Sequence, residues 1–84
     1  LVTEVERVGG WCLKLPAIHN AGLPDRLCLF PGGEVIFVEL KAFGKKPRKI
    51  QTLMHQKLKA MGFRVEVIDT TMGCKMLALE YDRK

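Results

Sequence analysis

The chain has 84 residues, which corresponds to a single domain over residues 1–84. Its net charge of +5 suits a polyanionic partner, although small soluble domains commonly carry a charge of this size. No apolar run is long enough for a membrane-spanning helix and no secretion signal is visible, while the cysteine pattern described next fits a reducing, intracellular compartment. The three cysteines show no paired spacing and predict neither a disulfide framework nor a zinc site. Cys12 and Cys28 lie in apolar segments and are predicted to be small core residues.

The N-terminal part of the chain predicts a helix, a short strand and a long loop. Apolar residues at positions 1, 2, 5 and 8 form a helical stripe, and Gly9-Gly10 ends it. Residues 11–15 predict a strand. Residues 16–24 predict a loop, because they contain asparagine, glycine and proline residues that interrupt regular structure.

A β-hairpin is predicted next. Residues 26–30 and 35–41 are β-rich runs joined by Pro31-Gly32-Gly33. A three-residue loop with glycine in the left-handed conformation is a common hairpin connection, and such a loop pairs Phe30 with Glu34. The apolar run at positions 35–38 is typical of a strand that is buried on both sides.

Two acidic residues and a lysine lie around this hairpin in a pattern that suits phosphodiester hydrolysis. Counted back from the turn, Asp25 pairs with Glu39 at a Cβ separation of about 5 Å, whereas a two- or four-residue loop would place them on opposite faces. Two carboxylates supply the hard oxygen ligands of Mg²⁺ or Mn²⁺, which polarises a phosphate and activates water. Lys41 emerges on the same face as Glu39, where it can position that water or offset charge in the transition state. A simple surface ion pair is the alternative interpretation of Glu39 and Lys41.

The second half of the chain predicts a helix, a strand and a final element. Pro47 suits the first turn of a helix, and Gly62 suits its C-terminal cap. Residues 63–69 predict a fourth strand, and residues 72–81 predict a final helix, although a strand is also compatible with that last segment. The apolar stripe expected on the first of these helices consists of Ile50, Leu53, Met54, Leu58 and Met61.

Basic residues gather between the predicted hairpin and the helix that follows. Four of them lie within five positions: Lys45, Lys46, Arg48 and Lys49. A solvated loop is the simplest interpretation of such a cluster. Because this cluster follows the strand that carries Glu39 and Lys41, contact with nucleic-acid phosphates is the favoured one.

These motifs together resemble a known family. The segment Gly22-Leu23-Pro24-Asp25-Arg26-Leu27, the run that ends in Glu39-Leu40-Lys41, the later Gln51 and the segment 62–65 resemble the VRR-NUC domain, a branch of the PD-(D/E)xK nuclease superfamily. The resemblance extends over residues 9–68. It implies a restriction-endonuclease-like α/β core, with a mixed sheet of about four strands and helices on both sides.

The resemblance also implies roles for individual residues. It makes Asp25 and Glu39 the metal ligands, with the backbone carbonyl of Leu40 as a possible third ligand. Lys41 is then a catalytic lysine, and Gln51 faces the active site from the first turn of its helix. These implications agree with the chemistry that the acids and the lysine suggest by themselves.

Other polar residues allow two interpretations each. Lys14 corresponds to a basic residue that is often present in the family, and it contacts either phosphate or solvent. The metal-binding helix glutamate of the family is either Glu4 or a residue upstream of Leu1, and a solvated carboxylate is the preferred interpretation of Glu4. His55 and His19 are either structural or close to nucleic acid, and neither is predicted to be a general base.

The resemblance implies a metal-dependent, structure-specific DNA endonuclease that uses Mg²⁺ or Mn²⁺. Its expected substrate is branched DNA such as a Holliday junction, its expected form is a homodimer, and its expected location is the cytoplasm of a bacterial or phage-infected cell. The alternatives are a non-catalytic DNA-binding or assembly module that keeps the fold, and a restriction-type enzyme, for which no region looks large enough. Candidate dimer-interface residues near the termini are Trp11, Met72, Met76 and Tyr81.

Overall fold

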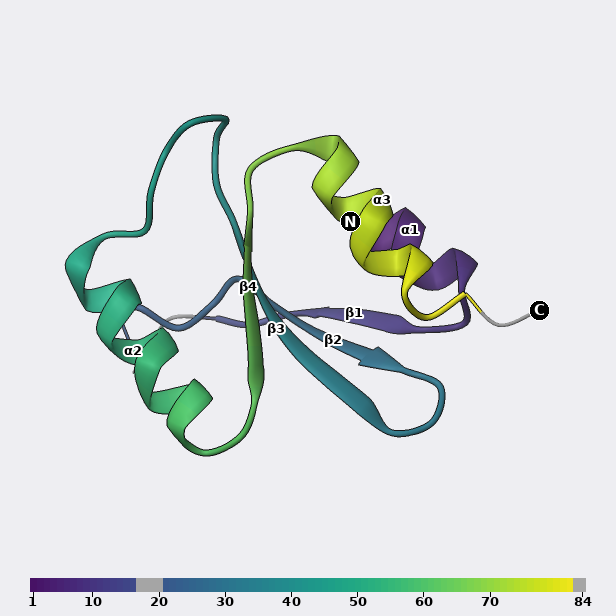
Figure 1. Ribbon diagram of the computed structural model, residues 1–84, viewed down its shortest axis with the longest axis horizontal. Helices are drawn as coiled ribbons and strands as arrows, with labels where there is room; N and C mark the ends of the chain where they lie inside the picture. The colour runs from purple at the N-terminus through teal and green to yellow at the C-terminus, as the bar shows by residue number, and fades with distance from the viewer. Residues whose placement is uncertain (17–20, 83–84) are drawn as a thin grey trace.

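The computed structural model describes residues 1–16 and 21–82, so His19 and part of the predicted loop lie outside the described residues. In these ranges the elements are α1 (Val2–Arg7), β1 (Trp11–Lys14), β2 (Arg26–Phe30), β3 (Glu34–Leu40), α2 (Lys49–Ala60), β4 (Arg64–Ile68) and α3 (Thr71–Leu79) (Figure 1). The predicted α/β class with a four-stranded mixed sheet is confirmed. None of the helices in these ranges has the length and apolar character that crossing a membrane requires.

The four strands form one sheet in the order β1-β2-β3-β4. The first three strands are antiparallel neighbours, whereas β4 pairs with β3 in parallel, and α2 makes the crossover between them. The predicted pairing of Phe30 with Glu34 is confirmed. Gly32 and Gly33 in the connecting loop have φ angles of +91° and +83°, a backbone conformation that residues other than glycine rarely adopt.

The predicted glycine at the end of α2 is confirmed, and the structure shows a side-chain cap at the start of α3. Gly62 follows α2 with a φ angle of +94°, as expected of a glycine just beyond a helix. The hydroxyl oxygen of Thr70 accepts a hydrogen bond of 2.9 Å from the backbone N–H of Gly73 and so caps α3. The final segment is therefore a helix, and the alternative of a strand there is wrong.

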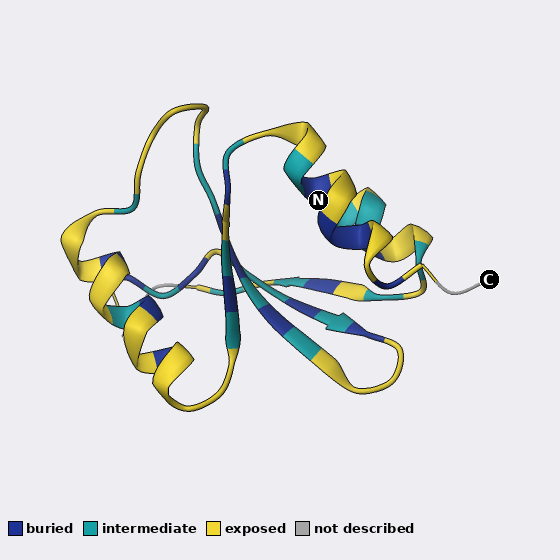
Figure 2. Ribbon diagram, viewed as in Figure 1, coloured by how far each residue is buried: buried dark blue, intermediate teal, exposed yellow. Residues whose placement is uncertain are grey.

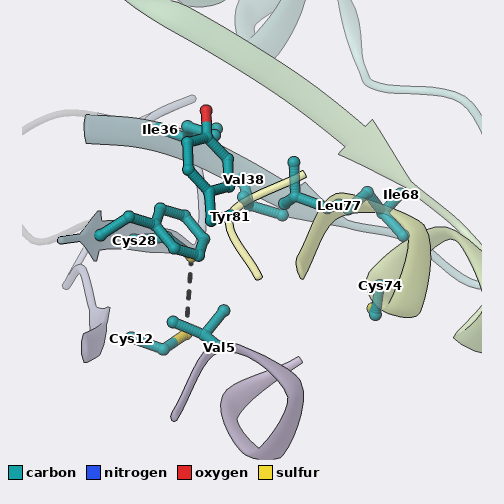
Figure 3. Packing of buried hydrophobic residues seen from close by; sticks show 10 residues of the cluster. Val5, Cys12, Cys28, Ile36, Val38, Ile68, Cys74, Leu77 and Tyr81 are labelled. Atoms are coloured by element: carbon teal, nitrogen blue, oxygen red, sulfur yellow. Dashed lines mark hydrogen bonds between the residues drawn. The ribbon is translucent and has the colours of Figure 1, made fainter. Parts of the chain in front are cut away.

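The main core lies between one sheet face and the two helices α1 and α3 (Figure 3). Alternate residues of β2 and β3 point to this face, because successive side chains of a strand point to opposite sides. Cys12 and Cys28 belong to this core, as predicted, with their free sulfur atoms 3.8 Å apart. Burial, with the neighbouring Cys12 as a second cause, raises the pKa of Cys28 to about 12.

Tyr81 belongs to this core too, so its prediction as a dimer-interface residue is wrong. Its ring stacks on Phe30 with the ring centroids 4.1 Å apart, and its hydroxyl accepts a hydrogen bond of 3.2 Å from Arg64. Position near the chain end carried no information about burial, because the turn after α3 places the Tyr81 ring on Phe30 of β2. Trp11, Met72 and Met76 are exposed, as an interface role requires.

The opposite sheet face is covered only in part, by α2. Of the apolar stripe predicted for this helix, Leu58 is buried and Met54 is half-buried. The prediction is wrong for Ile50, Leu53 and Met61, which are exposed. The side of α2 that is buried instead carries Gln51, His55 and Leu58. Residues spaced four and three apart share one side of a helix, so α2 turns two polar side chains toward the sheet.

The part of this face that α2 leaves uncovered is apolar. We call it the open sheet face and define it by the residues that alternate with the core positions of β1, β2 and β3. The expectation that residues 35–38 are buried on both sides is wrong, because α2 packs along β4 instead of over the hairpin. Figure 2 shows the alternation of buried and half-buried residues along these strands. The members of the open sheet face are Trp11, Leu13, Leu27, Leu29, Val35 and Phe37.

We predict that Tyr81→Ala lowers the free energy of unfolding by roughly 3 kcal/mol, because the lost ring leaves a cavity beside Phe30. Tyr81→Phe keeps the ring and should cost about 1 kcal/mol, the contribution of an ordinary hydrogen bond. Urea denaturation followed by circular dichroism measures both changes. Leu79→Ala, a substitution at an exposed apolar position of α3, is the matched control. A Tyr81→Ala variant as stable as this control would contradict the stacked, buried ring.

Candidate active site

The candidate site is centred on Glu39, near the C-terminal end of β3. Glu39 follows the core residue Val38 and therefore faces the opposite side of the sheet, toward α2. Its side chain is only 2% exposed. One carboxylate oxygen, Oε2, accepts a hydrogen bond of 2.9 Å from Gln51 and lies 3.3 Å from Lys41 Nζ. The carboxylate is thus held from both the helix and its own strand.

The second oxygen of Glu39 distinguishes this group from a structural ion pair. Oε1 is buried and has no hydrogen-bond partner among residues 1–16 and 21–82, and His55 Nε2 lies 4.0 Å from it. A buried polar atom without a partner carries a desolvation cost, so proteins rarely keep one without a function. The alternative of a surface ion pair between Glu39 and Lys41 therefore does not describe the structure, because Glu39 is buried.

Asp25 approaches the same strand from the start of β2. The register of β2 and β3 ends at Arg26 opposite Val38, and Asp25 is the next position toward Glu39. Asp25 Oδ2 accepts a hydrogen bond of 2.9 Å from the backbone N–H of Leu40. In an extended strand the N–H and C=O of one residue point toward the same neighbour, so the Leu40 carbonyl also faces the side of Asp25. A metal ion shared by the two carboxylates stays a prediction.

Gln51, in the first turn of α2, makes two hydrogen bonds at once through its side-chain amide. Its side-chain oxygen accepts a hydrogen bond of 2.8 Å from the backbone N–H of Arg48, which would otherwise be unpaired at the helix start. Its amide nitrogen donates to Glu39. Gln51 thus joins the start of α2 to the carboxylate and acts on it as a positioning residue.

His55 lies one turn after Gln51 and is buried on the same side of α2. Burial lowers the pKa of this imidazole, and the smaller, opposite effect of Glu39 does not outweigh it; Lys59 and Lys41 lower it further. The neutral form is therefore favoured beside Glu39. Of the two roles that the sequence left open, burial favours a structural one, since the ring does not lie on the surface.

The residues around Glu39 suit a hard divalent cation. No group of three or more His, Cys, Asp or Glu side chains that could hold a metal occurs in residues 1–16 and 21–82, so these ranges contain no fully protein-ligated site of that kind. Mg²⁺ usually keeps several waters and takes only one or two carboxylates. The oxygen atoms of Asp25, Glu39 and the Leu40 carbonyl therefore suit Mg²⁺ or Mn²⁺ better than Zn²⁺, which prefers thiolate and imidazole ligands.

The other predicted site residues lie elsewhere. Lys14 is exposed and pairs with Arg26 across from Val38, so the register places it on the face opposite Glu39. The structure does not bring Lys14 to the carboxylates, and its phosphate contact stays a prediction. Glu4 lies on α1, which packs on the core side, and it pairs with the amino group of Leu1 at 2.9 Å. The basic residues at positions 45, 46 and 48 are exposed between β3 and α2, and Lys49 is the exposed first residue of α2.

Known proteins are similar to this chain in sequence and in fold. The chain is 44% identical over 70 residues to the "Putative nuclease p44" of Acyrthosiphon pisum secondary endosymbiont phage 1, which covers 83% of this chain and 75% of that relative. A solved structure described as a "VRR_NUC domain" superposes with a TM-score of 0.85 and 30% identity, over 94% of this chain and 86% of the other. No family model matches the chain.

We predict that Gln51→Ala lowers the free energy of unfolding by roughly 1–3 kcal/mol, because it removes a partner of a buried carboxylate and the first-turn contact of α2. The measurement is urea denaturation in EDTA. Gln56→Ala is the matched control, since Gln56 is an exposed glutamine on the same helix. In a Glu39→Ala background the cost of Gln51→Ala should shrink, since the contact is already lost. Equal costs in both backgrounds would show that Gln51 does not act through Glu39.

Proposed function

Because the chain belongs to the VRR-NUC domain family, we propose that it is a metal-dependent, structure-specific DNA endonuclease. The proposed reaction is hydrolysis of phosphodiester bonds in branched DNA such as Holliday junctions. The observation that carries the proposal is the buried Glu39 carboxylate, one oxygen of which has no partner among the described residues. This carboxylate lies 3.3 Å from Lys41 Nζ, and Asp25 accepts a hydrogen bond from the next residue of the same strand, Leu40. An enzyme of this kind would act in the cytoplasm of a bacterial or phage-infected cell.

The chain's own residues divide the proposed chemistry among them. Asp25, Glu39 and the Leu40 carbonyl would hold Mg²⁺ or Mn²⁺, which when bound supplies polarisation of the phosphate and a lowered pKa for the attacking water. Lys41 shares the strand face of Glu39, so its ammonium group can orient the water or offset charge on the phosphate. Gln51 keeps the Glu39 carboxylate in place.

The basic segment supports nucleic acid as the partner. Four cationic side chains follow the catalytic strand directly, and all four are exposed. The phosphate backbone supplies most of the sequence-independent affinity of proteins for DNA, and lysine and arginine are the residues that contact it. We call this set the basic loop: Lys45, Lys46, Arg48 and Lys49.

The open sheet face supports a homodimer. A domain of this size buries only about 60% of its unfolded surface and is marginal on its own, so covering a further apolar face would stabilise it. Trp11 is the most exposed member of that face, at 61%. A two-fold dimer also presents two equivalent sites, which resolution of a junction by paired cuts requires. Met72 and Met76 lie on α3, on the other side of the sheet, and form a separate candidate surface.

We predict that Glu39→Gln and Lys41→Ala each reduce cleavage of a four-way junction by at least about 100-fold, because both residues act on the reacting phosphate. Chelation with EDTA should stop cleavage by the wild-type protein. The assay is gel analysis of labelled junctions in Mg²⁺ and Mn²⁺, with circular dichroism and DNA binding as checks on the fold.

Lys57→Ala, at an exposed lysine on α2, is the control and should cleave normally. Wild-type rates in either site variant would refute the assignment. Tight DNA binding by a wild-type protein that cuts in neither metal would favour the non-catalytic module instead.

The basic loop should set the salt dependence of binding. Each phosphate contact contributes roughly 0.9 to the slope of log affinity against log salt on duplex DNA. Replacement of the four basic residues by alanine should therefore flatten the slope measured by fluorescence anisotropy. Removal of Lys57 and Lys75, which are exposed on α2 and α3, should leave it nearly unchanged. An unchanged slope in the four-residue variant would place the DNA on another surface.

The wild-type protein should sediment as a dimer at micromolar concentration and cleave a four-way junction faster than linear duplex. Trp11→Glu should favour the monomer, because it introduces a charge into the open sheet face. Met76→Glu tests the separate surface on α3 in the same experiment. A wild-type monomer would remove the dimer from the proposal, and equal cleavage of junction and duplex would remove the substrate preference.

A further inference from the structure

Phe43 projects into solvent from the segment between β3 and α2. Its side chain is 82% exposed, the largest fraction among the exposed large apolar residues of the described chain. The segment extends away from the sheet and the helices (Figure 1), and nearly all of it is exposed (Figure 2). Such full exposure of a phenyl ring is costly, because aromatic side chains gain more than most from burial.

Backbone hydrogen bonds hold Phe43 in this position. The N–H of Lys45 donates to the carbonyl of Ala42 at 2.9 Å, which closes a four-residue turn with Phe43 at its first corner. Gly44 at the second corner has a φ angle of +78°, as a type II turn requires. The N–H of Gly44 donates to Asp69 Oδ2 at 3.0 Å and so ties the turn to the end of β4. The outward ring is thus a feature of an ordered turn.

The surroundings of Phe43 identify what the ring can contact. It lies two residues after Lys41 and two before the first lysine of the basic loop, and the whole sequence from 40 to 65 contains no aspartate or glutamate. An aromatic ring among cationic side chains is the combination with which proteins hold unpaired nucleic-acid strands, since cations contact the phosphates and the ring stacks on a base. A perfect duplex offers no free base face, because its bases are stacked on one another.

The proximity to the catalytic lysine sets where this contact would occur. Two backbone steps of 3.8 Å separate Phe43 from Lys41, so their Cα atoms lie at most about 7.6 Å apart. The ring and the ammonium group extend from these atoms by the length of their own side chains. A base held by Phe43 would therefore belong to a nucleotide close to the phosphate at Lys41.

Resting on the proposed function, we propose that Phe43 stacks on an unpaired or unstacked base next to the scissile phosphate. This contact makes Phe43 the residue that determines the preference for branched over fully paired DNA. The basic loop binds phosphates of either substrate, whereas the ring gains a contact only where a base is free.

The test compares binding to three DNAs in EDTA, so that cleavage does not enter: a four-way junction, a single strand and a linear duplex. Phe43→Ala should weaken binding to the junction and the single strand by roughly 5- to 150-fold, the effect of losing one stacked base. Binding to the duplex should change less than about twofold, since phosphate contacts dominate there. Phe43→Trp should retain the preference, and Leu79→Ala, at an exposed apolar position on α3, is the control.

Fluorescence can report on position 43 directly, because Trp11 is the protein's single tryptophan and can be replaced. In a Trp11→Phe background, Phe43→Trp creates a sole reporter whose emission should be quenched by the junction and the single strand but not by the duplex. Unquenched emission on all three DNAs would overturn the proposal. Equal losses of affinity for all three DNAs in Phe43→Ala would also overturn it. A Phe43→Ala variant that is monomeric where the wild-type protein is dimeric would overturn it too, because the ring would then contact a second copy of the chain.

The failures of the two proposals can be told apart. A wild-type protein that binds none of the three DNAs would overturn both the inference and the endonuclease function. A wild-type protein that binds and cleaves the junction, with a Phe43→Ala variant that keeps the same preference, would overturn only the role of Phe43.

Discussion

The hydrogen bond from Gln51 to Glu39 joins α2 to the sheet, and the site depends on it. Most apolar residues of this helix point to solvent, and Leu58 is the apolar residue that it buries. The attachment of α2 therefore relies on polar groups that also form the candidate site. In most small domains a helix is held by an apolar stripe, and its polar residues remain free to change. Here the same contact serves both the fold and the site, so the two cannot vary independently.

One face of the sheet carries the main hydrophobic core, and the other carries the candidate site. The face toward α1 and α3 contains the main core, including the stacked pair of Phe30 and Tyr81. That packing supplies stability without any catalytic group. The opposite face contains the buried carboxylate, which is costly by itself and is tolerated because the other face supports the fold. The division explains how an 84-residue chain accommodates an unpaired buried oxygen.

The charge distribution follows the same geometry. The segment after β3 contains the basic loop and Phe43, and its turn is tied to the end of β4 through Asp69. The residues that would bind DNA therefore follow β3 without an intervening strand or helix. A short connection of this kind keeps substrate-binding groups and reacting groups at a fixed separation, which is what efficient positioning of a phosphate requires.

Local chemistry in the sequence determined the hairpin and the placement of Asp25 beside Glu39 across it. Proline and two glycines define the three-residue loop, and the loop alone pairs Phe30 with Glu34, with Asp25 next in line toward Glu39. The same holds for the glycine after α2 and for the threonine that begins α3, because each acts within one turn of its own position.

Only the tertiary structure decided which side of α2 is buried, that Tyr81 lies in the core, and that Lys14 lies on the face opposite Glu39. These outcomes depend on packing between segments that are distant in the chain. Hydrophobicity along α2 suggested an apolar stripe, but the side of this helix that meets the sheet carries Gln51, which donates a hydrogen bond to the buried Glu39 carboxylate. Sequence patterns report what a residue prefers, whereas the fold decides which neighbour it meets.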